Sequence, residues 1–215
     1  MDKIFYNESS SAKLGWTPDW FGATYFDEDL LKKVRAFQKE YGLTADGLVG
    51  PTTYRRIWTQ RESNLLDHAP HELVDRKESF ILCNNNYFEI EWPRVVLPIE
   101  AGGLRLTSGF RTVREKREVT NFVSHWDVCL SAESCYRVLK NRGISVHFGI
   151  DNDGTIYQFM DCNHIAWHAG SSKWNNNSIG VEISNAYYPK HQDWYKRHGY
   201  GERPLWENKK VRGSY

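Results

Sequence analysis

The sequence predicts an α/β protein in which a mixed β-sheet is covered by helices and preceded by a small helical domain. Three observations lead to this prediction. Residues 27–41 repeat apolar side chains at helical spacing, and residues 119–184 alternate short apolar strands with one helical segment. No internal repeat of about 20 to 50 residues is present. The length of 215 residues allows one large domain, or one domain of ordinary size beside a small one.

Composition places the chain among folded proteins and excludes several classes of function. Hydrophobic residues make up 40% and aromatic residues 14%, which is enough for a buried core. Because 28 basic residues face 27 acidic ones, the chain lacks the excess positive charge of a nucleic-acid binder. No apolar run reaches the roughly 20 residues of a membrane span, and the start lacks a secretory signal pattern. We expect a protein made in the cytoplasm, without a membrane span or nucleic-acid partner. The sequence does not determine its oligomeric state.

The first expected element is an amphipathic helix over residues 27–41. Its apolar side chains recur at helical spacing, and its acidic first turn complements the helix dipole. Gly42 is expected to end this helix. A second, shorter helix is expected to begin near Pro51, a favourable first residue, and to reach Trp58.

The connection between these helices, residues 43–50, is rich in turn-forming residues, and Gly47 and Gly50 are predicted to take positive φ angles. With its flanking helices, the run VRAFQKEYGLTADGLVGPTT resembles the small three-helix peptidoglycan-binding domain of many cell-wall hydrolases. The matching residues are Val34, Phe37, Gln38, Gly42, Leu43, Asp46, Gly47, Gly50 and Thr53. The resemblance covers Leu14 to Trp58 and implies a wall-binding domain at residues 1–60. Taken alone, the same residues are also consistent with a scaffold that only holds a small helical bundle together.

The second domain is expected at residues 95–215, after a polar linker at residues 61–94 that merges into its edge. A strand is predicted at residues 119–127. Ser131 is then expected to cap a helix that stops at Gly143.

The following segments predict a hairpin and one more buried strand. Residues 144–150 and 155–160 are strand candidates joined by the turn-forming pair Asp153-Gly154. Residues 179–184 form the last short apolar strand. Strands with an intervening helix indicate a mixed sheet covered by helices.

The cysteines indicate free thiols rather than a structural metal site. The four residues, Cys83, Cys129, Cys135 and Cys162, form no CxxC pair of the kind that holds structural zinc. Without a secretory signal, four free and mostly buried thiols are favoured over a disulfide framework.

Four blocks in the second domain carry the most specific resemblance. FVSHWD, SVHFGIDNDGTIYQF, AWHAG and NNNSIGVEI occur in the order and spacing of the zinc-dependent N-acetylmuramoyl-L-alanine amidases. That family includes amidase-type phage lysozymes and bacterial muropeptide amidases, and its fold is shared with animal peptidoglycan-recognition proteins. The resemblance covers residues 119–184. It implies peptidoglycan as the partner and Zn²⁺ as the cofactor.

Amide hydrolysis needs a nucleophile that is available at neutral pH, and zinc supplies one by lowering the pKa of its bound water to about 7. The resemblance makes His125, at the end of a predicted strand, the match to the first zinc ligand. The alternative is a hydrogen-bonded core histidine. The reaction also needs a base that moves the water's proton to the leaving nitrogen, and a group that stabilises the oxyanion.

Glu182 is the candidate base. It interrupts an apolar strand, and a carboxylate placed there must be paired, protonated or near a metal. In the family branch written SIGIE, the matching glutamate orients and deprotonates the zinc-bound water. Other branches use a tyrosine before the HF motif, where this chain has Val146. The alternative is a simple outward-facing residue on an edge strand.

Three further residues are assigned to substrate contact because the WHAG segment borders the substrate groove in this family. They are Trp167, His168 and Asn177. His147 of the HF motif is expected to be a structural core residue.

The C-terminal part departs from the family pattern. There a long helix follows the SIGVE strand, and a later loop carries a second zinc histidine, an oxyanion lysine and a third ligand, Cys or Asp. The residues after Glu182 offer no match for these groups. Either the sequence is the front part of a longer protein, or His191, His198 or another residue substitutes. The charged tail at residues 190–212 is otherwise expected to be a solvated surface.

The favoured function is a peptidoglycan hydrolase that cuts the amide bond between N-acetylmuramic acid and L-alanine. A phage endolysin, released to the wall through a holin, is favoured over a bacterial muropeptide amidase. The rival is a non-catalytic peptidoglycan-binding protein with an incomplete zinc site. Because one recognised ligand cannot hold a catalytic zinc, the 215-residue chain alone is expected to have little or no activity.

Overall fold

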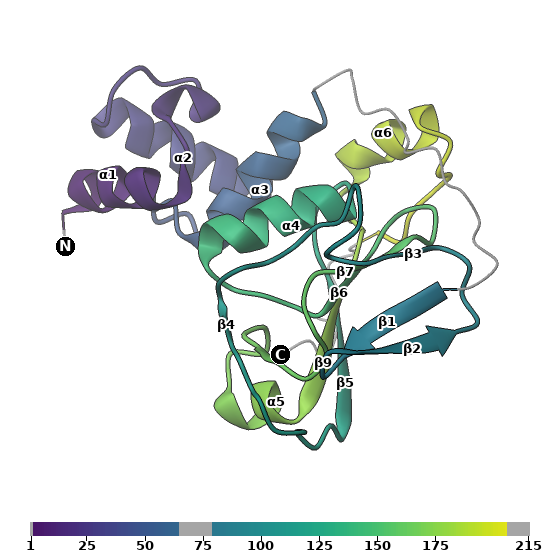
Figure 1. Ribbon diagram of the computed structural model, residues 1–215. Coiled ribbons are helices and arrows are strands. Elements are labelled where there is room, and N and C mark those ends of the chain that lie inside the picture. The colour runs from purple at the N-terminus through teal and green to yellow at the C-terminus, as the bar shows by residue number, and fades with distance from the viewer. Residues whose placement is uncertain (1, 65–78, 206–215) are drawn as a thin grey trace. The chain divides into compact units, whose positions relative to one another are not determined.

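The computed structural model describes residues 2–64 and 79–205, and the chain divides into two compact units, Met1–Leu66 and Asp67–Tyr215 (Figure 1). The first unit is helical. Its elements are α1 (Lys3–Leu14), the 3₁₀ helix η1 (Pro18–Phe21), α2 (Glu28–Glu40) and α3 (Pro51–Glu62). The predicted helices at residues 27–41 and from Pro51 are confirmed. The Asp27 side chain caps α2 by accepting from the Leu30 N–H at 3.0 Å.

The core of the first unit explains which of its helices the sequence shows clearly. Helix α2 buries Leu30, Leu31 and Val34 along one face, which produces the helical repeat. Helix α1 buries only Asn7 and Leu14, so its residues show no apolar stripe. This weak pattern is why α1, which lies before the Leu14 to Trp58 resemblance, was not located from the sequence.

One backbone prediction in the loop between α2 and α3 is wrong. Gly47 has the expected positive φ of 83°, but Gly50 has a φ of −78° and an extended conformation. Gly50 is the N-cap residue of α3 and directly precedes Pro51. A residue before proline is driven to extended backbone, so this position does not need a left-handed turn.

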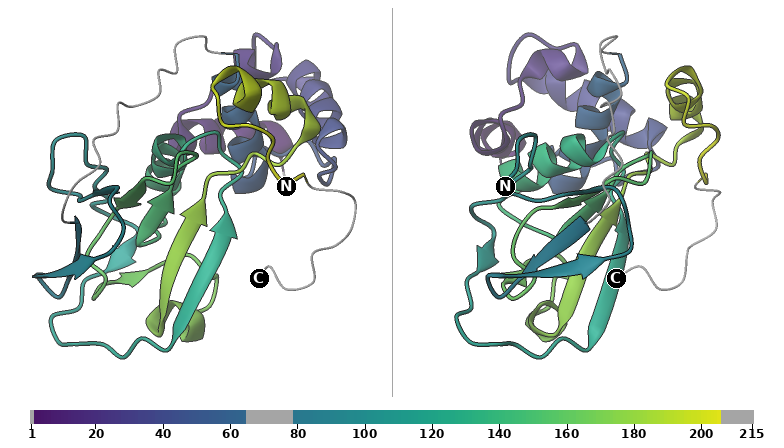
Figure 2. Two further views of the ribbon diagram at one scale, coloured as in Figure 1. Left: turned by 90° about the vertical axis from the view of Figure 1, so that its right-hand side faces the viewer. Right: turned by 45° about the vertical axis from the view of Figure 1, so that its right-hand side comes forward.

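The second unit contains the predicted mixed sheet. Its five strands have the spatial order β3-β7-β6-β9-β5. They are β3 (Val95–Val96), β5 (Asn121–Trp126), β6 (Phe148–Ile150), β7 (Ile156–Gln158) and β9 (Ser178–Ile183). The hairpin partners β6 and β7 are antiparallel, and the other neighbouring pairs are parallel. Figure 2 shows β9 and β5 side by side as the two longest arrows of this sheet.

The helices and two small sheets complete the second unit. They are α4 (Ala132–Arg142), α5 (Ser172–Asn176), η2 (Pro189–His191), α6 (Gln192–Arg197) and the pairs β1–β2 (Ser79–Cys83, Asn86–Ile90) and β4–β8 (Phe110–Arg111, Ile165–Ala166). The predicted limits of α4 are confirmed, since Ser131 caps its start and Gly143 ends it with a φ of 65°. No helix of the described residues is long and apolar enough to cross a membrane.

The segment predicted as a linker, residues 61–94, contains a β-hairpin. Strands β1 and β2 pair around Asn84 and Asn85, whose φ angles of 52° and 59° fit the tight turns of two-residue hairpins. Residues 65–78 of the predicted linker lie outside the described part of the chain. The hairpin escaped prediction because β2 is exposed along most of its length and shows no inward apolar side.

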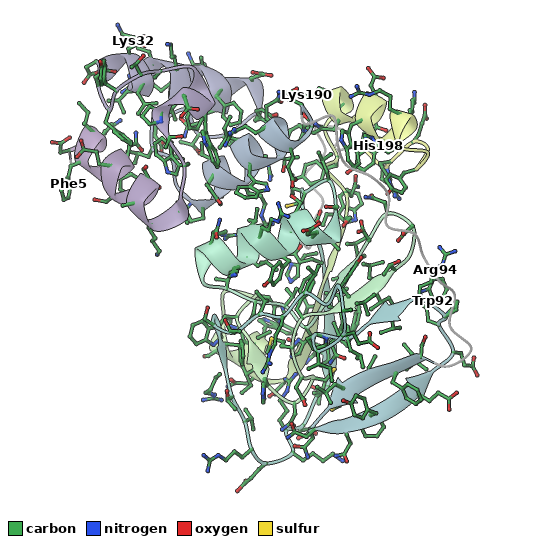
Figure 3. All side chains as sticks on the ribbon, turned by 45° about the horizontal axis from the view of Figure 1, so that its top comes forward. Phe5, Lys32, Trp92, Arg94, Lys190 and His198 are labelled. Carbon is green, nitrogen blue, oxygen red and sulfur yellow. The ribbon has the colours of Figure 1, made fainter. Side chains whose placement is uncertain are left out.

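The segment after this hairpin is attached to the turn between β6 and β7. Trp92 donates through its indole N–H to the Gly154 carbonyl at 2.7 Å, and Arg94 donates to the Asp153 carbonyl at 2.9 Å. Figure 3 shows the two labelled side chains close together at this edge of the unit. The Asp153-Gly154 pair therefore forms the expected turn and is anchored through its carbonyls.

The expectation of a solvated tail at residues 190–212 is wrong for its described part. Trp194, Tyr195 and His191 are buried, and the first two pack with Leu130 and Ala186 in one hydrophobic cluster. Helix α6 is too short to show an apolar repeat, so the basic residues dominated the sequence pattern. Residues 206–212 lie outside the described part of the chain.

Candidate active site

The two residues predicted to carry the chemistry lie on neighbouring strands. His125 on β5 and Glu182 on β9 are Cα partners in the parallel register, so both side chains leave the same face of the sheet. Glu182 is 6% exposed and is buried. Gly149 on β6 is the next Cα partner in this row, and a Cβ built there would meet the Phe159 ring at 2.5 Å. This face is therefore closely packed beside the glutamate.

A chain of hydrogen bonds holds the imidazole of His125. Its Nε2 lies 3.0 Å from Nδ1 of His168, and Nε2 of His168 lies 3.0 Å from the Ser178 hydroxyl. Ser178 donates its own proton to the Trp174 carbonyl at 2.6 Å, so it accepts from His168. His168 then accepts at Nδ1 from the Nε2–H of His125. In this arrangement Nδ1 of His125 is the nitrogen that keeps a lone pair.

His168 is placed by its backbone as well as by its ring. The Asn175 side chain accepts from the N–H groups of His168 and Ala169 at 3.2 and 2.9 Å. The ring lies over Gly180, where a Cβ would come within 2.7 Å of it, so only glycine leaves room there. Burial and the nearby His125 lower the pKa of His168 to about 4. The ring is therefore neutral at pH 7, as the hydrogen-bond chain requires.

His147 is fully buried, as expected for a structural residue. Its Nδ1 accepts from the Gly180 N–H at 3.0 Å, and its Nε2 lies 2.9 Å from the His164 carbonyl. Burial lowers the pKa of His147 to about 3. Arg117 approaches the same ring at 3.1 Å and donates to the carbonyls of Cys162 and Ser178. The histidine thus fixes the β9 backbone on which Ser178 and Gly180 lie.

A pocket of about 570 Å³ lies next to this site, between β4, β8 and α5. Trp167 lines it and is 47% exposed; its contact with substrate stays a prediction. His168 and Asn177 are not among the lining residues, and Asn177 is exposed at the end of α5. The lining is Phe110, Arg111, Thr112, Ile165, Trp167, Gly170, Ser171, Ser172, Asn175 and Asn176.

Arg111 and Asn175 also line this pocket, although neither was predicted as a site residue. Arg111 contributes a cation to the pocket and donates to the Asn176 side chain at 3.3 Å. Asn175 belongs to the quoted NNNSIGVEI block, so its position in that block was the available signal. Arg111 lies outside the four blocks, and its strand β4 has only two residues.

Within the described residues, one group of three side chains could hold a metal ion by proximity. Ligand-type atoms of Asp127, Cys129 and Cys135 lie within 4.8 Å of one another. The Asp127 carboxylate already accepts from the N–H groups of Cys129 and Asn185 and from the Ser184 hydroxyl. Burial raises the pKa of Asp127 well above its ordinary value, and nearby negative groups add to this effect. This group is fully buried, and its carboxylate holds the surrounding backbone through hydrogen bonds. It has no open position for a substrate.

Among the described residues, no group of three metal-ligating side chains includes His125. His198, one suggested substitute, stacks on Trp194 with ring centroids 4.2 Å apart, and its Nδ1 lies 2.7 Å from the Trp194 carbonyl. His191, the other, is buried edge-on against Tyr188. A three-ligand zinc site is therefore not complete in the part of the chain that the structure describes.

Two family models match this chain in the regions that the geometry singles out. The N-acetylmuramoyl-L-alanine amidase model matches residues 115–201, which include both His125 and Glu182. Residues 115–201 are an N-acetylmuramoyl-L-alanine amidase domain. The putative peptidoglycan binding domain matches residues 12–57, within the first unit. Both predicted resemblances are confirmed.

The solved structures similar to this chain include an endolysin, the catalytic domain of XlyA and an AmpD derivative. A mutant endolysin from Bacillus subtilis is 29% identical, with 43% of this chain and 62% of that chain covered and a TM-score of 0.30. The catalytic domain of XlyA is also 29% identical, with 43% and 63% covered and a TM-score of 0.29. A selenomethionyl AmpD derivative is 19% identical, with 47% and 78% covered and a TM-score of 0.27. The match spans less than two thirds of the first two proteins. No curated protein sequence gives a significant match.

Proposed function

We propose that this protein is a peptidoglycan hydrolase that cleaves the amide bond between N-acetylmuramic acid and L-alanine. The observation that carries the proposal is the amidase domain itself, in which His125 and Glu182 share a face and a register position on adjacent strands. The putative peptidoglycan binding domain at residues 12–57 is consistent with an insoluble wall substrate. A phage endolysin that reaches the wall through a holin is the setting that this pair of domains fits best.

In this proposal Glu182 accepts a proton from the attacking water and delivers it to the leaving nitrogen. Its burial favours such a role, because charge acts more strongly where water is excluded. His168 and Ser178 hold His125 in one tautomer. Trp167 offers an exposed ring at the pocket, on which a sugar ring can stack.

Zinc is the cofactor that the family resemblance implies, and when bound it supplies a nucleophilic hydroxide near neutral pH. His125 fits as one ligand, because its Nε2–H is donated to a neighbour and its Nδ1 keeps a lone pair. The described residues do not supply the remaining ligands, so no step is assigned to the metal.

The proposal is tested by incubating the protein with purified sacculi and Zn²⁺ and counting newly released L-alanine N-termini. In any form of the protein that hydrolyses the wall, Glu182→Gln should lower the rate by about 10²- to 10⁴-fold, because the amide keeps the shape but cannot accept the proton. Glu89→Gln, on exposed strand β2, is the matched control and should keep the full rate. Wall binding and zinc content should not change in either variant. Equal rates for Glu182→Gln and the wild type would remove Glu182 from the mechanism.

The second candidate is a wall-binding protein without catalysis. The incomplete ligand set around His125 in the described residues favours it. The two candidates separate in the same assay. Sedimentation of the protein with sacculi, without any alanine N-termini at saturating Zn²⁺, would support the binding protein. Robust turnover by this chain would show that another group completes the site.

A further inference from the structure

The β1–β2 hairpin is held on the second unit by a small set of side chains. Gln158 on β7 accepts from the Leu82 N–H at 2.7 Å and donates to the Leu82 carbonyl at 2.6 Å. The Asp161 carboxylate accepts from the N–H groups of Asn84 and Asn85 at 2.7 and 2.8 Å. A two-stranded hairpin is only marginally stable by itself. Its position therefore depends on these contacts with the loop that follows β7.

Two cysteines meet at this attachment point. The Cys162 N–H donates to the Leu82 carbonyl at 3.1 Å, which brings the backbone of Cys162 next to the end of β1. The Cys83 thiol lies close enough to the Cys162 thiol for a side-chain hydrogen bond. Both thiols are free, and Cys83 is partly exposed whereas Cys162 is buried. The two thiols thus lie side by side on neighbouring backbone segments, which a disulfide requires.

We infer that Cys83 and Cys162 form a disulfide under oxidising conditions, which locks the β1–β2 hairpin onto the loop that follows β7. The bond would close a loop of about 80 residues, long enough to restrict the unfolded chain strongly. Hydrogen bonds also connect Cys162 with the candidate site. The Cys162 carbonyl accepts from Arg117, and Arg117 in turn contacts His147. This inference does not depend on the proposed hydrolytic activity.

A small-molecule disulfide such as oxidised glutathione is a sufficient oxidant. The Cys83 thiolate attacks it, forms a mixed disulfide and releases one glutathione thiolate. The Cys162 thiolate then attacks the Cys83 sulfur, forms the protein disulfide and releases the second glutathione. The protein loses two thiol protons and two electrons, and the oxidant is reduced to two glutathione molecules. Burial raises the pKa of Cys83 and raises that of Cys162 to about 12, so exchange is expected to be faster at pH 9 than at pH 7.

The test treats the reduced, folded full chain with oxidised glutathione at pH 9, alkylates the remaining thiols and maps peptides without reduction. We expect one linked pair that joins the peptides of Cys83 and Cys162. The oxidised protein should melt about 5–15 °C above the reduced one. In Cys83→Ser this linked peptide and most of this difference in melting temperature should be absent. Because the fully buried Cys129 and Cys135 remain in that variant, it controls for any oxidation at the second pair.

Three outcomes would overturn the inference. One is a stable mixed disulfide at Cys83 with Cys162 still alkylated. Another is a link from Cys83 to a second copy of the chain or to a different cysteine. The third is the expected link without a rise in melting temperature, which would show that the bond does not lock the hairpin. If Cys83→Ser fails to fold, peptide mapping and melting of the wild-type protein in its two redox states still decide the question.

Discussion

Gln38 in the first unit offers a sharp test of how the loop at residues 43–50 is held. Its side-chain amide donates to the Leu48 carbonyl at 3.0 Å and to the Thr53 hydroxyl at 3.1 Å, and its carbonyl accepts from the buried Gly47 N–H at 2.9 Å. Gln38 is only 2% exposed. The residue therefore acts as a hub between α2, the loop and the start of α3.

Gln38→Leu keeps the approximate size of the side chain and removes every one of these hydrogen bonds. The Gly47 N–H and the Leu48 carbonyl then lose this partner, at about 1–3 kcal/mol for each buried unsatisfied group. The expected loss is about 2–6 kcal/mol. A unit of this size is stabilised by only about 3–10 kcal/mol, at about 0.05–0.15 kcal/mol per residue. We therefore expect the substitution to remove most of the stability of the first unit.

Hydrogen exchange measured by mass spectrometry can detect this loss of stability in the full chain. Peptides from α2 and α3 should lose protection in Gln38→Leu, while peptides from β5 and β9 serve as the internal reference. Gln60→Leu is the matched control, because the half-buried Gln60 accepts one hydrogen bond from Tyr41 and water can replace it. Its expected cost is below about 1 kcal/mol. Wild-type protection of α2 and α3 in Gln38→Leu would refute the assignment of Gln38 as the hub.

Three further predictions concern other parts of the chain. Because the pKa of His147 is lowered to about 3, the unfolded chain binds this proton first as the pH falls, so this contribution to stability is complete above about pH 6.5 and is lost toward pH 3. At about 1.4 kcal/mol per pH unit the loss reaches about 5 kcal/mol, and urea unfolding of His147→Gln should show a weaker acid dependence than the wild type. Nitrogen NMR of the metal-free protein should show His125 protonated at Nε2, and His168→Leu should return it to a mixture of tautomers, whereas an unchanged spectrum would contradict the hydrogen-bond chain. A fragment of residues 1–66 should sediment with sacculi, and recovery no higher than for an unrelated control protein would reduce this unit to a scaffold.

Local signals predicted α2, α3, α4 and four of the five strands of the main sheet. The α4 helix carries its own start and stop in Ser131 and Gly143, and α2 carries an apolar stripe, so each can be located without knowledge of the rest of the chain. Strand β2 and helix α6 lack such signals. Strand β2 is exposed, and α6 is short and depends on contacts with Leu130 and Ala186, which are distant in sequence. Tertiary contacts of this kind leave no periodic pattern.

The same difference separates the predicted and unpredicted parts of the candidate site. His125 and Glu182 lie in recognisable blocks, and the parallel pairing of β5 with β9 brings them to the same register position. The role of Ser178 follows only when α5 and β9 are folded together, because the Trp174 carbonyl determines the direction in which the hydroxyl donates. That direction in turn makes Nδ1 of His168 the acceptor for the Nε2–H of His125. A sequence block therefore identifies which side chains gather here, but the hydrogen-bond partners decide which nitrogen of His125 is left to bind a metal.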